Sequence, residues 1–380
     1  MTTPIVSPAS IFAPPPPPQP GIDFPLGWLL ENASPAIQYR AIIDVAQLGQ
    51  DIRADINDLP YSYRPALELA VQADIDGVWN NSMLRLPSQR SEHFEGVGTV
   101  PAFRRLTEYG WNKEAPPLFH SRRVLFRLLA EDSDDRSQLY ELAPTKAKVE
   151  EEFLISQRQL LREAAGAALA GAGFEGDPRL RGLARRTIDR IGDFLRSPLA
   201  EKPWIRVGNK QVLHPEAFPP TMNALHLIAH MPLFQSEHYQ TMELLYEYLT
   251  RPLPRQDPVQ QVGTQLCPVP HVVLGDLLPH RNAVEGDIPA ALGWLELMAR
   301  LGFLRRNDNW TKMYERFIED SDRTGVWHPR KGMAMPKSTN PYVWPMFPLE
   351  AVHGGDERWT DVTFRVGLIA RLSGRPVELI

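Results

Sequence analysis

Two pairs of side chains in this chain have the residue types and the spacing that zinc binding requires. His226 and His230 stand four residues apart on a segment predicted to be helical, so their rings fall on one face, one turn apart. Cys267 and His271 have the same separation on a proline-broken loop. Imidazole nitrogens and a thiolate are common zinc ligands. The alternative is structural: a packed or solvated histidine pair and a buried free cysteine.

An acidic run, Asp132-Ser133-Asp134-Asp135, offers a second kind of chemistry. A carboxylic acid that its neighbours keep neutral inside an apolar cavity is acidic enough to protonate a substrate. Asp132, Asp134 and Asp135 are therefore the candidate catalytic residues. Because the run directly follows a predicted helix over residues 121–131, the competing interpretation is a solvated loop between helices.

A third pattern has the spacing of a magnesium site. Asn307, Thr311 and Glu315 lie at positions i, i+4 and i+8, which places their oxygen atoms along one helical face. The aspartate-rich partner motif that such a site needs is missing from any plausible upstream helix. An ordinary N-cap at Asn307 or Asn309 explains the run more simply. The sequence therefore leaves the cofactor unknown.

The composition is that of an ordinary globular protein and excludes several classes. The chain has 380 residues, of which 43% are hydrophobic and 23% charged, with a net charge of −5. A nucleic-acid binder usually needs a basic face, and no apolar run approaches the ~20 residues that span a bilayer. One cysteine, Cys267, cannot form an internal disulfide and fits a reducing compartment. We therefore expect a cytoplasmic location.

Proline separates a predicted tail from the rest of the chain. Residues 14–18 are an unbroken proline run, which adopts an extended polyproline helix and cannot pack as an α-helix. We expect residues 1–23 to form a disordered proline-rich tail, or a ligand for the proline-binding groove of a protein partner. Residues 24–380 are expected to form a single domain.

Helical periodicity dominates this predicted domain, and no convincing run of alternating strand residues is present. The alanine-rich stretch of residues 164–170 predicts close helix packing. Residues 198–219 are expected to form a short hairpin or a loop over the core, and residues 251–289 a long loop. The predicted helices cover residues 36–48, 63–74, 98–109, 121–131, 150–172, 178–196, 220–230, 237–250, 290–301, 309–320 and 360–372.

Two short motifs recur near opposite ends of the chain: Asp76-Gly77-Val78-Trp79 and Thr324-Gly325-Val326-Trp327. Each follows a predicted helix. Glycine allows the chain to turn sharply after a helix, and the tryptophan can then fold back as a large apolar plug. We predict that both tryptophans are buried and that both glycines lie just beyond a helix end. The recurrence indicates stacked helix pairs.

The two motifs resemble the Gly-x-Trp turns of the α/α-toroid superfamily, which includes terpenoid cyclases and the β subunits of protein prenyltransferases. Leu301-Gly302 before the second turn, and Pro336, Trp344-Pro345 and Leu349 after it, are similar to the segments that flank those turns. The glutamine that precedes the turn in the cyclases is missing here. The resemblance implies an all-α fold, an α/α toroid in which paired helices form a ring. It also relates the acidic run of residues 132–135 to the motif of class II terpene cyclases.

The function implied by the resemblance is the binding or transformation of an apolar, isoprenoid-like ligand in a central cavity. The loop aromatics Trp327, Tyr342, Trp344 and Phe347 would then contact the ligand. Because a fold does not fix a function, two alternatives stay open: a non-catalytic protein-interaction scaffold, and a carbohydrate-active lyase or hydrolase. A polar lining with converging acids would favour the last of these, and an apolar lining the first. Whether the chain is an enzyme stays open.

Overall fold

The computed structural model describes most of the chain as two compact units, which are treated separately here. Unit 1 comprises residues 1–80, 85–120 and 278–380, and unit 2 comprises residues 81–84 and 121–277. Within the described residues, no helix is both long enough and apolar enough to cross a membrane. The described residues are 19–49, 54–88, 94–129, 151–252, 256, 259–262, 265–268, 275–276, 288–328, 340–350 and 359–380, with the side chains of residues 151–156 and of some residues in 262–268 left out.

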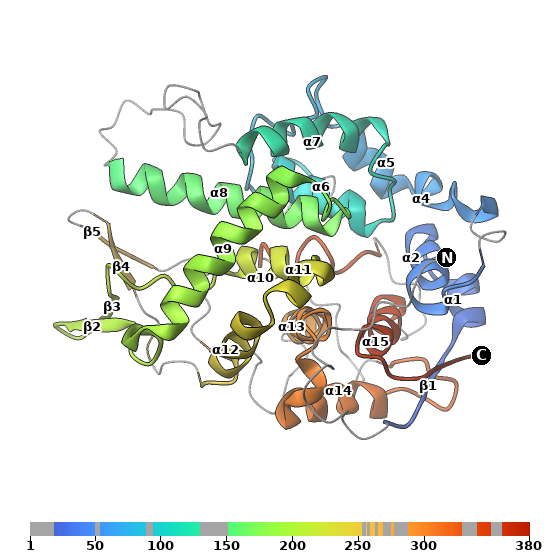
Figure 1. The fold of residues 1–380 in the computed structure, drawn as a ribbon. Coiled ribbons are helices and arrows are strands. Elements are labelled where there is room, and N and C mark those ends of the chain that lie inside the picture. The colour runs from blue at the N-terminus through green and yellow to red at the C-terminus, as the bar shows by residue number, and fades with distance from the viewer. Residues whose placement is uncertain are drawn as a thin grey trace. The chain divides into compact units, whose positions relative to one another are not determined.

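Unit 1 is mainly helical and contains one two-stranded sheet (Figure 1). Its second helix begins at Pro35, one residue before the predicted start, and continues as a π-helical segment over Ala41–Ala46. Helix α7 (Pro116–Leu128) begins in unit 1 and continues into unit 2. The other elements are β1 (Ile22–Phe24), α1 (Leu26–Asn32), α2 (Pro35–Arg40), α4 (Leu59–Ser62), α5 (Arg64–Ala70), α6 (Thr99–Glu108), α13 (Ile288–Arg300), α14 (Asp308–Glu319), α15 (Thr360–Leu372) and β6 (Val377–Leu379).

The core of unit 1 is built around α13 and α15, which pack against each other and are buried on nearly all sides. Strands β1 and β6 pair in parallel, with Ile22 opposite Val377. Gly367 lets the ring of Phe24 lie directly against α15, because a Cβ at that position would overlap the ring. The N-terminal and C-terminal strands are therefore both fixed to the most buried helix of the unit.

The two Gly-Val-Trp turns have the same structure, and their predicted burial is confirmed. Trp79 is 0% exposed and Trp327 is 2% exposed. Gly77 and Gly325 follow helices α5 and α14 with φ angles of 78° and 72°, in the left-handed region that favours glycine. A β-bridge closes each turn. It pairs Ala73 with Trp79 in the first turn and Ser321 with Trp327 in the second.

An aspartate organises each turn. The Oδ1 atom of Asp74 accepts hydrogen bonds from the backbone N–H groups of Asp76 and Val78. The Oδ1 atom of Asp322 accepts the equivalent bonds from Thr324 and Val326. Such Asx turns satisfy backbone N–H donors of the turn itself. The repeated signal in the sequence is therefore Asp-x-x-Gly-Val-Trp, longer than the motif first recognised.

A threonine from the next described helix completes each turn. The backbone N–H of Trp79 donates to the hydroxyl of Thr99 on α6 at 3.1 Å, and that of Trp327 donates to the hydroxyl of Thr363 on α15 at the same distance. Trp79 also donates its indole N–H to the carbonyl of Leu69 at 2.8 Å. Each turn thus joins the helix before it to the helix after it.

Unit 2 combines helices with a four-stranded sheet in the order β2-β3-β4-β5. Strands β2 and β3 form an antiparallel hairpin whose turn contains Gly208 at φ 61°, as tight hairpins require. The elements are α8 (Glu151–Gly171), α9 (Pro178–Arg196), β2 (Trp204–Val207), β3 (Lys210–Leu213), α10 (Met222–Ala229), α11 (Pro232–Glu237), α12 (Tyr239–Leu249), β4 (Val259–Val262) and β5 (Gln265–Pro268).

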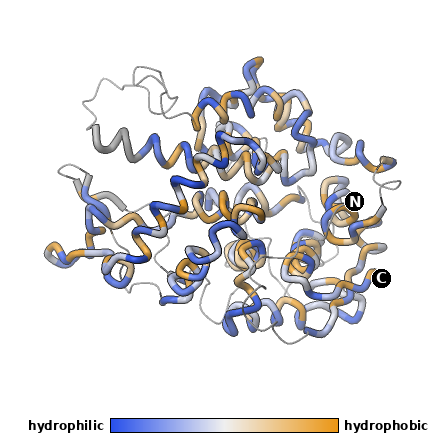
Figure 2. Tube along the Cα trace, in the orientation of Figure 1, coloured by the Kyte–Doolittle hydropathy of each residue, from blue (hydrophilic) through white to orange (hydrophobic). Residues whose placement is uncertain are grey.

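Helices α8 and α10 pack closely in unit 2, which confirms the prediction for the alanine-rich stretch. Residues 164–170 are all buried, and a Cβ at Gly166 would overlap the side chain of Leu183. Helix α10 is buried along its whole length and is mostly orange in the hydropathy colouring of Figure 2. Such a helix is typical of a protein core.

The predicted fold class, an all-α ring of paired helices, is wrong. Helices dominate, but unit 1 holds the β1–β6 pair and unit 2 the four-stranded sheet, so the fold mixes helices and strands. The strands have three or four residues each, too short for an alternating pattern to stand out in the sequence. The hairpin was left open as an alternative for residues 198–219, whereas β4 and β5 lie in a segment that was predicted to be a loop.

Candidate functional site

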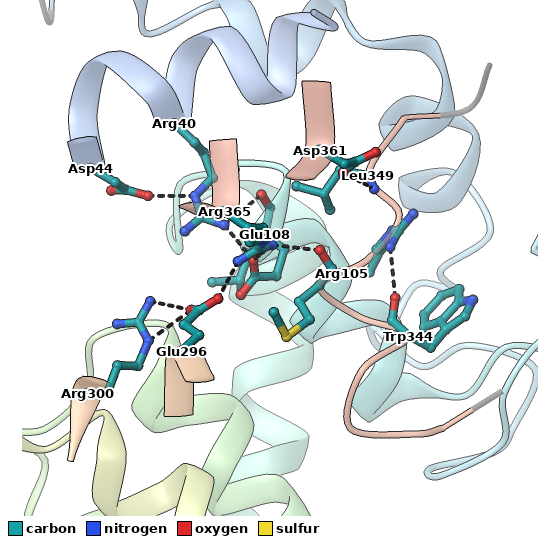
Figure 3. Close-up of polar contacts among 12 residues, drawn as sticks. Arg40, Asp44, Arg105, Glu108, Glu296, Arg300, Trp344, Leu349, Asp361 and Arg365 are labelled. Atoms are coloured by element: carbon teal, nitrogen blue, oxygen red, sulfur yellow. Dashed lines mark hydrogen bonds and ion pairs between the residues drawn. The ribbon is translucent and has the colours of Figure 1, made fainter. Parts of the chain in front are cut away.

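The most unusual feature of unit 1 is a cluster of charged side chains inside its core (Figure 3). Arg365 on α15 is fully buried and bridges two carboxylates, Glu108 of α6 at 2.6 Å and Glu296 of α13 at 2.8 Å. Glu108 also pairs with Arg40 at the end of α2. Glu296 also pairs with Arg300, one turn along α13, at 2.8 Å. Four elements of the unit therefore meet at one ion-pair network.

The arginines keep both glutamates of this network ionised. Burial alone would raise the pKa of Glu108, but Arg40 and Arg365 outweigh it and hold this pKa well below its usual range. Burial likewise opposes ionisation of Glu296, and the nearby Arg365 and Arg300 leave its pKa lowered. A carboxylate held in this state cannot serve as a proton donor near neutral pH. The network supplies fixed charge rather than acid–base chemistry.

The segment of residues 340–350 lies across this part of unit 1 and is held by buried side chains. Arg105 donates to the carbonyl of Trp344 at 2.8 Å and to that of Pro348, and its guanidinium also lies over the Trp344 ring. Arg365 donates to the carbonyl of Met346 at 2.6 Å. Tyr63 donates its hydroxyl to the carbonyl of Leu349 at 2.8 Å. These bonds fix the position of the residue that follows, Glu350.

Glu350 and Asp361 form a pair of carboxyl groups at the end of this segment. Asp361 is fully buried, and its two oxygens accept the backbone N–H groups of Leu349 at 2.7 Å and of Glu350 at 3.1 Å. Glu350 Oε1 accepts the backbone N–H that precedes α2, from Ser34 at 2.8 Å, and the Thr360 hydroxyl at 3.0 Å. Both of these bonds go to Oε1, which leaves Oε2 as the oxygen that can carry a proton.

The surroundings of Glu350 move its ionisation to neutral pH. Burial, and next the negative charge of Asp361, raise the pKa of Glu350 to about 7, against the hydrogen bonds from Ser34 and Thr360. Arg105 and Tyr109 also face this pair: burial raises the pKa of Tyr109, Arg105 lowers it, and both carboxylates raise it. A carboxylic acid whose pKa is raised to about 7 by burial and a neighbouring carboxylate is an arrangement that acid–base catalysis uses.

The structure places the predicted aromatic residues in two different surroundings. Trp327 closes its turn and contacts Trp359, with ring centroids 5.4 Å apart. Tyr342 and Phe347 are buried in the segment described above, and Trp344 is half-buried there beside Arg105. Contact of these four side chains with an apolar ligand stays a prediction.

The predicted zinc ligands are only partly described. His226 and His230 lie on and just after α10 with their rings stacked, centroids 6.3 Å apart, and His230 Nδ1 lies 2.9 Å from the His226 carbonyl. The backbone of Cys267 belongs to β5, and His271 lies outside the described residues. Among the described side chains, no group of three or more His, Cys, Asp or Glu residues could hold a metal ion. A zinc site stays a prediction.

The remaining predictions for acidic residues have different outcomes. Asp132, Asp134 and Asp135 lie outside the described residues. The N-cap interpretation of Asn307 is confirmed, because its side chain accepts the backbone N–H groups of the first turn of α14. Glu315 binds Arg375 at 2.6 Å and so already has a cationic partner.

The residues of the charge cluster were not recognised from the sequence. Two of them are single charges inside otherwise apolar helical runs: Glu296 in Trp-Leu-Glu-Leu-Met and Arg365 in Thr-Phe-Arg-Val-Gly. Charged residues are almost never fully buried unless they are paired, so one on the apolar face of a predicted helix indicates a buried partner. That signal finds the residues, but pairing them needs the tertiary structure.

Comparison with known proteins adds no further information on the site. No family model, no curated protein and no solved structure matches this chain. The resemblance to the α/α-toroid superfamily therefore has no support beyond the turn motifs themselves. Any functional conclusion has to come from the geometry of unit 1.

Proposed function

We propose that this protein is an enzyme that applies acid–base catalysis to a polar substrate, the chemistry that carbohydrate-active lyases and hydrolases use. The observation that supports this proposal is the Glu350–Asp361 pair. Glu350 is anchored through one oxygen, its pKa is raised to about 7 and it is only partly buried among the described residues. Strongly perturbed carboxyl groups of this kind concentrate at functional sites.

The two states of Glu350 would serve two steps. In its protonated form the Oε2 proton can be given to a leaving oxygen, and in its ionised form the same oxygen can accept a proton from a substrate or a water molecule. Asp361 would act as a positioning residue, because its bonds to the backbone of Leu349 and Glu350 fix the segment and its charge tunes the pKa of Glu350.

A polar substrate is preferred over an apolar one because of the Glu350 carboxyl group. An apolar ligand offers no hydrogen-bond partner to the Oε2 atom of Glu350, and covering a carboxyl group without giving it a hydrogen bond costs free energy. The predicted isoprenoid-like ligand and the predicted scaffold role stay predictions without a supporting contact among the described residues.

The test is a screen of the purified full chain against neutral and acidic polysaccharides and glycosides. Hydrolysis is detected as new reducing ends, and elimination as the ultraviolet absorbance of the conjugated double bond it creates. We expect activity on at least one substrate, with one limb of the pH profile near pH 7. Glu350→Gln should lower this activity at least ~100-fold, the usual contribution of a general acid or base.

A matched variant separates catalysis from general damage. Glu319→Gln makes the same chemical change at an exposed position of α14 and should keep full activity. Circular dichroism should report an unchanged fold for both variants. The proposal is wrong if no substrate in the panel is turned over, or if Glu350→Gln remains as active as Glu319→Gln.

A further inference from the structure

We infer that Arg104 forms an anion-binding site at the edge of the charge cluster and receives the carboxylate or phosphate group of a small acidic molecule. The inference rests on the proposed function and deepens it, since it gives the substrate a negative charge. It concerns binding, and binding can be measured without catalysis.

The first observation is that Arg104 has a charge without a counter-ion. Arg104 lies on α6 one turn before Glu108, so the two side chains leave the same face of the helix. The Glu108 carboxylate, however, is already bound by Arg40 and Arg365. Among the described residues, Arg104 forms no hydrogen bond and no ion pair, whereas the other guanidinium groups of the cluster each have an anionic partner.

The second observation is the charge balance of the cluster. Arg40, Arg300 and Arg365 are matched one for one by three carboxylates, those of Asp44, Glu108 and Glu296. Arg104 adds a fourth cation, so the cluster residues named here carry one positive charge in excess among the described residues. A buried or half-buried charge without a partner is costly, and an anionic ligand would remove that cost.

The third observation is that the Arg104 side chain is partly exposed while its guanidinium group has lost part of its hydration. Its side chain is half-buried by exposed area, yet enough protein surrounds the guanidinium that loss of hydration lowers its pKa, against the opposing effects of Glu108, Tyr342 and Glu296. The Nε–H of the fully buried Arg365, which shares Glu108 as an electrostatic partner with Arg104, has no acceptor among the described residues. Two guanidinium groups therefore have donor capacity that no described side chain uses.

The chemistry of the guanidinium group selects the ligand. Its N–H donors form a planar fork that matches two oxygens of a carboxylate or a phosphate, and these charge-assisted bonds are among the strongest in proteins. Chloride and a neutral sugar lack the two negatively charged oxygens that make the paired contact strong. An acidic sugar, which carries a carboxylate on a polar ring, combines this requirement with the proposed function.

The experiment is calorimetric titration of the full chain at constant ionic strength with galacturonate, galactose and inorganic phosphate. Galactose differs from galacturonate by lacking the carboxylate, so the pair isolates the charge. We expect galacturonate to bind at least ~10-fold more tightly than galactose, and Arg104→Gln to remove that difference. Phosphate binding should also depend on Arg104.

Two variants keep the result interpretable. Arg323→Gln removes the same charge from an exposed position in unit 1 and should bind the probes as the parent does. Arg104→Lys keeps the charge but not the fork, and should bind galacturonate with intermediate affinity. The inference is overturned if no anion binds, if galactose and galacturonate bind alike, or if Arg104→Gln binds as well as the parent. If neutral glycosides are hydrolysed but none of the anions binds, the proposed function stands and this inference is refuted.

Discussion

Replacing Glu350 with glutamine should stabilise the protein at alkaline pH while leaving its stability at acidic pH unchanged. Burial and Asp361 raise the pKa of Glu350 in the folded protein to about 7, from an ordinary value of 4.5. In that pH interval the folded state keeps a proton that the unfolded state has lost, so the free energy of unfolding falls as the pH rises from about 4.5 through 7.

The size of this effect follows from the two pKa values. The gap between about 7 and 4.5 corresponds to at most ~3.5 kcal/mol, because each pKa unit is worth ~1.4 kcal/mol. Glu350 is partly exposed, so solvent screening makes the measured value smaller. Glutamine imitates the protonated form: its amide oxygen can still accept the bonds from Ser34 and Thr360, but it carries no charge beside Asp361.

Urea unfolding at several pH values between 5 and 8 measures the difference. The parent and Glu350→Gln should have similar free energies of unfolding at pH 5, and the variant should be the more stable protein at pH 8. Glu319→Gln, at an exposed position, should follow the parent at every pH. Parallel curves for the parent and Glu350→Gln would refute the assignment of a neutral-range proton to this residue.

Four further substitutions test the packing of unit 1. Trp327→Ala removes a buried indole and should lower the free energy of unfolding by ~3–5 kcal/mol. Trp79→Ala should lower it by at least as much, because it also loses the hydrogen bond to the Leu69 carbonyl. Unfolding midpoints close to the parent's would contradict the role of these tryptophans as buried plugs. Arg365→Met leaves Glu108 and Glu296 without a shared cation and should cost ~3–5 kcal/mol by urea unfolding, less if both glutamates are replaced by glutamine at the same time. Gly325→Ala puts a Cβ against the Asp23 carbonyl at a positive φ, so its thermal midpoint should fall well below that of Gly171→Ala, where a Cβ would meet nothing.

The sequence was a good guide to the turns because their determinants are local. The positive φ of Gly77 and Gly325, the capping by Asn307 and the burial of both tryptophans depend on neighbours a few residues away. Periodicity also located most helices, although the segment predicted as one helix over residues 36–48 contains a π-helical part over Ala41–Ala46.

The candidate site could not be predicted in the same way because its partners are distant in the chain. The bond between Arg365 and Glu108 joins residues 257 positions apart, and that between Glu350 and Ser34 joins residues 316 positions apart. The strands were missed for a related reason. Ile22 pairs with Val377 across nearly the whole chain, and a three-residue strand has no periodicity to reveal it. Local patterns fix the turns and the helices, whereas only packing decides which charges meet.

The repeated turn also separates what holds it together from what it presents to its surroundings. Its aspartate, glycine, tryptophan and threonine contacts all lie along or inside the turn. The exposed residues near the two turns differ in chemistry. Val71 and Ile75, which precede Trp79, are 78% and 90% exposed. The equivalent exposed positions before Trp327 are Glu319 and Arg323. The turn thus behaves as a connector with an exchangeable exterior. Its surface chemistry can diverge between copies, or be rewritten by design, while the joint between the two helices stays intact.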